Sequence, residues 1–150
     1  MPEEEPIERA KEDAREGKLP STQAGEFVRE EIEHIREGKH GARSAKQAIA
    51  IGLSKARRAG VKLSPPKKGT VSKKTRRQAK RDLAKGRRGG SKRTSRRRSQ
   101  AMKKALQREG RSAASKRALS RQTHAAARRR SAADRSRAEK KAARTRKRTR

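Results

Sequence analysis

Arginine and lysine dominate the second half of the chain, where they stand in short runs. Residues 67–150 hold 35 Lys or Arg and only 4 Asp or Glu. A guanidinium group pairs with a phosphate through two parallel hydrogen bonds, and an ammonium group meets it as a compact charge. Side chains of these types at this density predict contacts to the phosphates of a polyanion.

We expect the phosphate contacts to come from basic residues on both sides of the chain's middle. The expected contact residues are Arg43, Lys46, Lys55, Arg57, Arg58, Lys67, Lys68, Lys73, Lys74, Arg76, Arg77, Arg87, Arg88, Lys92, Arg93, Arg96, Arg97, Arg98, Lys103, Lys104, Arg128, Arg129, Arg130, Lys140, Lys141, Arg146, Lys147 and Arg148.

Other chemistries find little support in the sequence. The chain has no cysteine and no tyrosine, and its histidines are His34, His40 and His124. His34 and His40 lie near several glutamates, but no metal-ligand spacing such as His-Glu-x-x-His is present. We therefore expect no enzyme, no catalytic residue, no metal site and no cofactor.

The aromatic and amide content restricts how a nucleic acid would be read. Phe27 is the sole aromatic residue, so modules that stack unpaired bases on aromatic rings are excluded. The chain has no asparagine, one of the two side chains best suited to adenine, and base-specific reading is poorly supported. The sequence favours recognition of charge over recognition of bases, and it leaves the choice between DNA and RNA open.

Charge divides the chain into three zones. Residues 1–37 hold 12 acidic and 6 basic side chains, and residues 38–66 hold 7 basic and none that are acidic. The formal net charge is +32, and only 27% of the residues are hydrophobic. Such a composition is typical of disorder and leaves apolar surface for a small local core only.

A short, polar helix is expected over residues 7–16. Two further segments in the first two zones have helical periodicity. Ser21 or Thr22 is expected to cap the first, whose apolar stripe ends before a stop at Gly38. Ser44 and Gln47 have capping-box spacing for the second, which is expected to end at Gly60.

Together these segments predict a helical hairpin over residues 21–63. Its core is expected to consist of Phe27, Val28, Ile32, Ile35, Ile49 and Leu53. Ala48, Gly52 and Ala56 are small enough to let the other helix approach closely. A core of this size is marginal alone, so homodimerisation through the hairpin would stabilise it.

The remainder reads as an acidic leader at 1–20, a Pro/Lys linker at 64–71 and a basic tail at 72–150. The tail is low in complexity and has helix-forming stretches at about 72–85, 94–109 and 112–147. Like charges repel at helical spacing, so we expect these stretches to be largely disordered when free and to gain helix on phosphate. The predicted fold class is all-α, with a small hairpin and a long, conditionally helical tail.

The stretch KHGARSAKQAIAIGLSKARRAG at 39–60, within a block covering 26–60, resembles a domain of small basic bacterial proteins of uncharacterised function. Residues 96–131 resemble a second part of the same proteins. The resemblance implies a bacterial source and brings no activity and no functional residues. In composition the tail is also similar to linker-histone and bacterial histone-like tails.

We expect a nucleoid-associated, histone-like protein that neutralises and compacts or bridges DNA with little sequence preference. An RNA-binding or ribosome-associated protein is one alternative, and an adaptor whose hairpin docks a protein partner is another. No stretch is apolar enough for a membrane span, so we expect no membrane partner and a cytoplasmic, nucleoid location. The acidic residues at 3–16 have two equally favoured interpretations. They could mask the basic tail by contacting it, or they could form a leader that is simply solvated.

Overall fold

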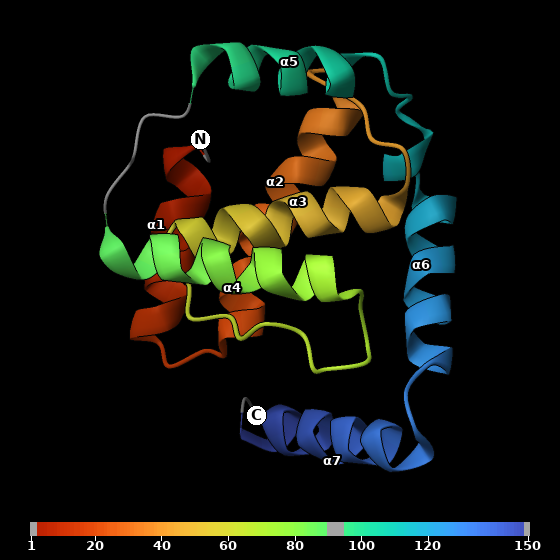
Figure 1. The fold of residues 1–150 in the computed structure, drawn as a ribbon. Coiled ribbons are helices and arrows are strands. Elements are labelled where there is room, and N and C mark those ends of the chain that lie inside the picture. The colour runs from red at the N-terminus through yellow and green to blue at the C-terminus, as the bar shows by residue number, and fades with distance from the viewer. Residues whose placement is uncertain (1–2, 90–94, 149–150) are drawn as a thin grey trace. The chain divides into compact units, whose positions relative to one another are not determined.

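A computed structural model describes residues 3–89 and 95–148, and its regular elements in these ranges are helices. They are α1 (Glu4–Arg15), α2 (Pro20–Arg36), α3 (Ala45–Arg58), α4 (Lys73–Arg88), α5 (Arg96–Gln107), a 3-10 turn η1 (Ser112–Ala114), α6 (Lys116–Arg128) and α7 (Ala132–Arg148) (Figure 1). The predicted all-α class is confirmed. The chain divides into two compact units, one ending at Ser115 and one beginning at Lys116.

The α2–α3 hairpin forms the centre of the first unit. The two helices cross in close contact (Figure 1), with Phe27 and Ala56 in one buried cluster and Ile35 and Ala48 in another. Gly52 lies so close to α2 that a β-carbon there would be 2.6 Å from the Val28 Cα atom. The predicted close approach at the small residues of α3 is confirmed.

The ends of these helices follow the sequence signals in part. Ser44 caps α3 by accepting a hydrogen bond from the Gln47 amide at 3.2 Å. Gly38 ends α2 with φ of 80°. The expected cap at Ser21 or Thr22 is wrong, because α2 begins at Pro20, whose missing N–H suits the first turn.

Helix α1, expected as a short polar helix over residues 7–16, begins at Glu4 and packs on α2. Ala10 is buried in a cluster with Ala24, Phe27, Ala56 and Val61, and Ile7 packs against the same cluster. Small and medium apolar side chains are enough for this packing because they share one cluster with the fully buried Phe27. The leader is therefore part of the folded unit.

A second cluster lies at the other end of the hairpin. Ile35, Ala42 and Ala48 are buried there with Ala113 and Ala114, and Ile32 packs against them. Of the predicted core residues, Phe27 and Ile35 are fully buried, and Val28, Ile32, Ile49 and Leu53 are partly buried. Alanines supply most of the remaining buried apolar surface.

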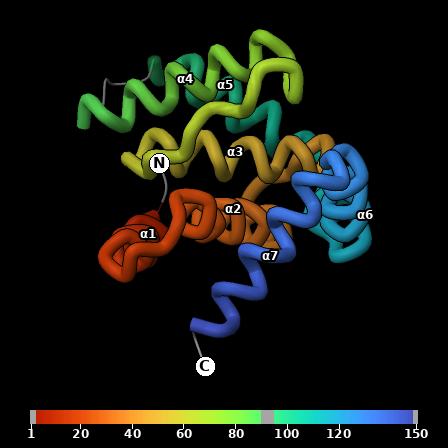
Figure 2. The backbone as a smooth tube through the Cα atoms, turned by 90° about the horizontal axis from the view of Figure 1, so that it is seen from below, coloured from red at the N-terminus to blue at the C-terminus, as the bar shows by residue number. Residues whose placement is uncertain are grey.

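Helix α4 packs along α3, so the basic region is not a free tail behind a free linker. Gly86 lies against the last turn of α3, where a β-carbon would be 2.0 Å from the Arg57 carbonyl oxygen. Figure 2 shows α3 between α4 and the α1–α2 pair. Ala79, Asp82 and Gly86 are spaced by three and four residues, which gives α4 a narrow inner face. The expectation of a disordered tail, which was based on charge, did not include this face.

The segment after α5 is a second anchor for the basic region. The Gly41 amide donates to the Leu106 carbonyl at 2.9 Å, and the Ala42 amide donates to the Gly110 carbonyl at 3.1 Å. A β-carbon on Gly41 would be 1.9 Å from the Glu109 carbonyl oxygen, which explains the glycine. Ala113 and Ala114 then enter the second cluster.

The second unit contains α6 and α7, described here by itself. The single helical stretch expected at 112–147 is divided. Helix α7 has a start of its own, where Ser131 Oγ accepts a hydrogen bond from the Asp134 amide at 3.1 Å. Neither helix contains a buried residue within the described range. None of the helices in the described ranges has the length and apolar character that crossing a bilayer requires.

Candidate nucleic-acid interface

The outer face of α4 carries a continuous set of basic side chains. Its inner face, with Ala79 and Asp82, is buried against α3, so the charged residues face solvent. The exposed set is Lys73, Lys74, Arg77, Lys80, Arg81, Lys85, Arg87 and Arg88. Lys80, Arg81 and Lys85 are not among the contact residues expected from the sequence. Lys80 and Arg81 follow Arg77 by three and four residues, and Lys85 follows Arg81 by four, which is the spacing of one helix face.

A buried carboxylate positions α4. Asp82 is 1% exposed and accepts hydrogen bonds from Ser54 Oγ at 2.6 Å and from Gln78 Nε2 at 3.0 Å. Arg58 Nε lies 3.6 Å from the Asp82 carboxylate. The buried carboxylate is thus satisfied by α3 and α4 together, which fixes the rotation of α4 about its axis.

Two predicted phosphate-binding residues have a different role in the structure. Lys55 Nζ lies 2.6 Å from Glu31 Oε2 and 3.6 Å from Glu30 Oε2, and the lysine side chain is 17% exposed. Arg57 is 7% exposed and donates to the carbonyl oxygens of Leu63 and Ser64. Both side chains are directed inward because they compensate polar groups of the first unit.

Arg57 and Arg76 are both held by groups of the first unit. Removal from water lowers the pKa of the Arg57 guanidinium, an effect that Asp82 partly opposes. Arg76 is also engaged, donating from Nε to the Pro66 carbonyl oxygen at 3.1 Å. Arg76 therefore holds the 64–71 connection against α4, and its neighbour Arg77 faces solvent.

The start of α3 adds two exposed basic residues to the first unit. Lys46 is exposed, and the Arg43 side chain is 81% exposed with its Nε 3.8 Å from Glu109. Lys67 and Lys68, in the connection to α4, are exposed as well. All four remain available to a ligand in the described structure.

Most other predicted residues are exposed. In α5 these are Arg96, Arg97, Arg98, Lys103 and Lys104, and α5 contains no buried residue. In the second unit they are Arg128, Arg129, Arg130, Lys140, Lys141, Arg146, Lys147 and Arg148. Lys92 and Arg93 lie outside the described residues.

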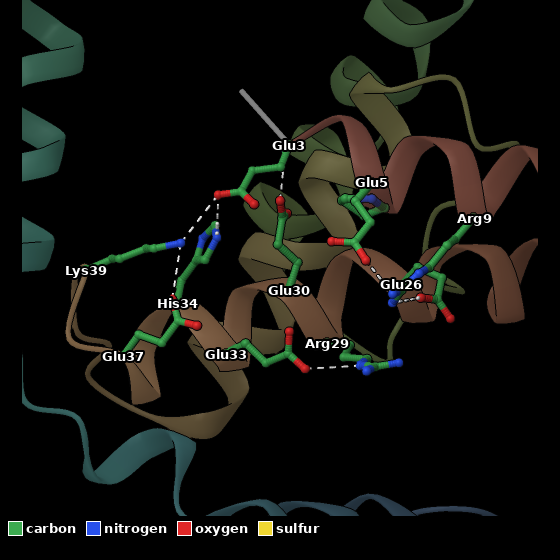
Figure 3. Close-up of a pocket in the computed structure, with 11 residues that line it drawn as sticks. Glu3, Glu5, Arg9, Glu26, Arg29, Glu30, Glu33, His34, Glu37 and Lys39 are labelled. Carbon is green, nitrogen blue, oxygen red and sulfur yellow. Dashed lines mark hydrogen bonds and ion pairs between the residues drawn. The ribbon is translucent and has the colours of Figure 1, made fainter.

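The α1–α2 pair presents the opposite charge. A pocket on it is lined by Glu3, Glu5, Pro6, Arg9, Glu26, Arg29, Glu30, Glu33, His34, Glu37 and Lys39 (Figure 3). Its carboxylates are paired locally: Glu5 with Arg9, Glu33 with Arg29, and Glu3 with Lys39. Lys39 and then His34 lower the pKa of the Glu3 carboxyl.

Comparison with known proteins gives one match. Residues 21–68, which span α2, α3 and part of the connection to α4, match a family of unknown function (DUF6496). No curated protein matches the chain, and neither does any solved structure. The residues themselves must therefore carry the argument for function.

Proposed function

We propose that this protein binds DNA through its phosphates, with little preference for base sequence, and neutralises and compacts or bridges DNA in the bacterial nucleoid. The outer face of α4 is the observation that carries the proposal. It is a fixed, solvent-facing row of lysine and arginine whose inner face is committed to α3. A solubilising charge run needs no such fixed orientation.

The dimensions of α4 suit a duplex. Its 16 residues span about 24 Å at the α-helical rise. That length corresponds to about seven base pairs at 3.4 Å per pair. Several phosphates are therefore within reach of one helix face at the same time, and each contact releases condensed counterions.

Bridging needs more than one surface, and a single chain offers two. The first unit provides the α4 face, and the second unit provides exposed basic residues along α6 and α7. Two linked binding surfaces gain affinity through their high effective concentration. A homodimer through the hairpin, predicted from its small core, is not required for this, since α1, α4 and η1 supply packing for the hairpin.

In the second unit, we expect helix formation in α7 to depend on binding to phosphates. Arg137 and Lys141, Lys140 and Arg144, and Arg144 and Arg148 are like-charged pairs four residues apart in α7. Such pairs destabilise an isolated helix, and phosphates relieve the repulsion. We expect α7 to be partly unfolded at low salt and to gain helix on DNA, with circular dichroism of a 116–150 peptide as the measurement. A helix content unchanged by DNA would contradict this part of the proposal.

The test of the main proposal compares two charge-matched double variants of the full chain. Lys80→Gln/Arg81→Gln removes two charges from the α4 face, and Lys11→Gln/Arg15→Gln removes two from exposed positions of α1. Affinity for random duplex DNA is measured by anisotropy at several salt concentrations. The slope of log affinity against log salt should fall by about 2 for the α4 pair and remain close to wild type for the α1 pair.

The same titrations separate the rival interpretations. Equal changes for both double variants would mean that net charge alone governs binding, and the α4 interface would be refuted. Preference for structured RNA over duplex DNA of the same length would move the proposal to the RNA-binding alternative. Weak binding to both nucleic acids at physiological salt would leave the adaptor alternative.

A further inference from the structure

The structure brings two histidines together with buried glutamates. Glu31 and His34 lie one turn apart on α2, and His40 lies in the loop that joins α2 to α3. One ligand-type atom from each of these residues lies within 4.8 Å of the others. His34 also belongs to a second group of this kind with Glu3 and Glu30, which Figure 3 shows around its ring.

The hydrogen bonding of His40 leaves one ring nitrogen facing an acceptor. His40 Nδ1 lies 3.0 Å from the Gly41 carbonyl oxygen, which accepts only, so Nδ1 carries a proton. Nε2 lies 3.1 Å from Glu31 Oε1, a distance at which either a proton on Nε2 or a cation between the two atoms would bridge them. A histidine whose Nδ1–H is held by a backbone carbonyl is oriented as metal-binding histidines are.

The charge balance beneath the histidines also favours a cation. Glu31 is 1% exposed and Glu30 is 7% exposed, so both carboxylates are removed from water. Lys55 is the ammonium that pairs with both Oε2 atoms. Lys55 balances one carboxylate charge, and Glu30 Oε1 also accepts from the Glu3 amide at 2.8 Å. The remaining charge of Glu31 is then compensated by His40 or by a cation beside it, since an isolated buried carboxylate is costly. Because Lys55 occupies the Oε2 side of Glu31, the Oε1 side remains directed at His40.

We propose that Glu31, His34 and His40 bind a divalent transition-metal ion, for which Zn²⁺ is the best match. Two imidazoles and one carboxylate are a common three-residue zinc set, with a fourth position for water or another oxygen ligand. Ligand atoms around tetrahedral zinc are separated by about 3.3 Å. The 3.1 Å separation between His40 Nε2 and Glu31 Oε1 is close to that edge.

Such an ion would have a structural consequence for the first unit. It would link the last turns of α2 to the α2–α3 loop at His40, the residue directly before Gly41 and Ala42. The amides of Gly41 and Ala42 donate to the carbonyls of Leu106 and Gly110. Metal binding would therefore stabilise the loop on which the segment following α5 is anchored.

The test is a calorimetric titration of metal-stripped full-length protein with Zn²⁺, in wild type and in single His34→Gln, His40→Gln and His124→Gln variants. His124 lies on α6 in the second unit and is the matched control for loss of a histidine. We expect one Zn²⁺ per chain and a higher midpoint of thermal unfolding with the ion. Affinity should fall at least about tenfold in the first two variants, as loss of a ligand requires, and remain unchanged in the control.

Three results would overturn the proposal. The first is a wild-type protein that does not bind Zn²⁺ one to one. The second is an equal loss of Zn²⁺ affinity in all three variants. The third is a His40→Gln variant that has native circular dichroism and keeps the wild-type affinity for Zn²⁺. Should His40→Gln fail to fold, His34→Gln decides, because its loss leaves the Glu31–His40 contact in place. Visible absorption of the Co²⁺-loaded wild type provides a second readout, since a tetrahedral site gives intense bands and adventitious surface binding does not.

Discussion

Replacing Gly86 by alanine tests whether α4 is docked on α3, which is the main structural support for an oriented phosphate-binding face. Gly86 lies near the end of α4, and a β-carbon there would be 2.0 Å from the Arg57 carbonyl oxygen and 3.2 Å from the Gly60 amide nitrogen. Both neighbours are backbone atoms, so no side chain can rotate out of the way. The helices would have to separate.

The sign of the effect distinguishes a docked helix from a free one. In a solvated helix, Gly→Ala stabilises by about 1 kcal/mol, because alanine has less backbone freedom to lose. Here a carbon and an oxygen that normally stay about 3.3 Å apart would be forced together, and overpacking of this kind costs about 1–3 kcal/mol. Set against the gain from alanine, we expect a net destabilisation of about 1 kcal/mol and a midpoint lower by about 4 °C.

The assay is thermal and urea unfolding of the full chain followed by far-ultraviolet circular dichroism. Gly25→Ala is the matched control, since Gly25 is exposed within α2 and a β-carbon there meets nothing within 4 Å. That control should be stabilised by up to about 1 kcal/mol. If Gly86→Ala raises the midpoint as Gly25→Ala does, α4 is not packed on α3 and the argument for its oriented outer face is refuted.

Two further expectations concern the ends and the linkage of the helices. Ser44→Ala should cost about 1 kcal/mol of unfolding free energy, since it removes the cap on the Gln47 amide. Ser95→Ala is the control and should be neutral, because the helix start at Ser95 has no side-chain cap. Equal effects of the two variants in urea unfolding would contradict the assignment of the cap. Ser54→Ala should cost about 1–3 kcal/mol, because it takes a hydrogen bond from the buried Asp82 carboxylate; an unchanged urea midpoint would show that Asp82 is not buried against α3.

The hairpin could be predicted because its signals are local. The Ser44–Gln47 spacing, the stop at Gly38 and the small residues of α3 each depend on a few neighbouring positions. The apolar stripe of α2 was equally visible, and its two largest members, Phe27 and Ile35, are fully buried. Local propensity and the global fold agree over this stretch.

The docking of the basic region could not be predicted in the same way. Its contacts join residues far apart in the sequence and use groups that look unremarkable in it, such as the glycines at 41 and 86 and the alanines at 113 and 114. Composition suggested too little apolar surface for packing, but glycine allows backbones to approach without large side chains. The buried roles of Lys55 and Arg57 were missed for the same reason, since a charged residue type alone does not reveal its partner.

The candidate metal ligands illustrate the limit further. His34 and His40 were noticed beside glutamates, but the intervening Gly38 and the loop gave no recognised ligand spacing. Only the fold shows that Glu31, rather than a nearer glutamate, faces His40 and is nearly free of solvent contact. This set depends on a loop that returns to the helix it leaves, and none of the usual ligand spacings describes that arrangement.

The arrangement of charge on the first unit bears on whether its acidic leader masks the basic surface. The carboxylates of Glu3, Glu5 and Asp13 are paired with Lys39, Arg9 and Lys18 of the same unit. Helix α1 lies with α2 on the side of α3 away from α4, as Figure 2 shows. Within this unit the acidic residues are therefore not placed to cover the α4 face. Under the proposed function, their field would repel a polyanion from one side and favour its approach from the other. The leader would then act on the orientation of binding more than on occupancy of the α4 face.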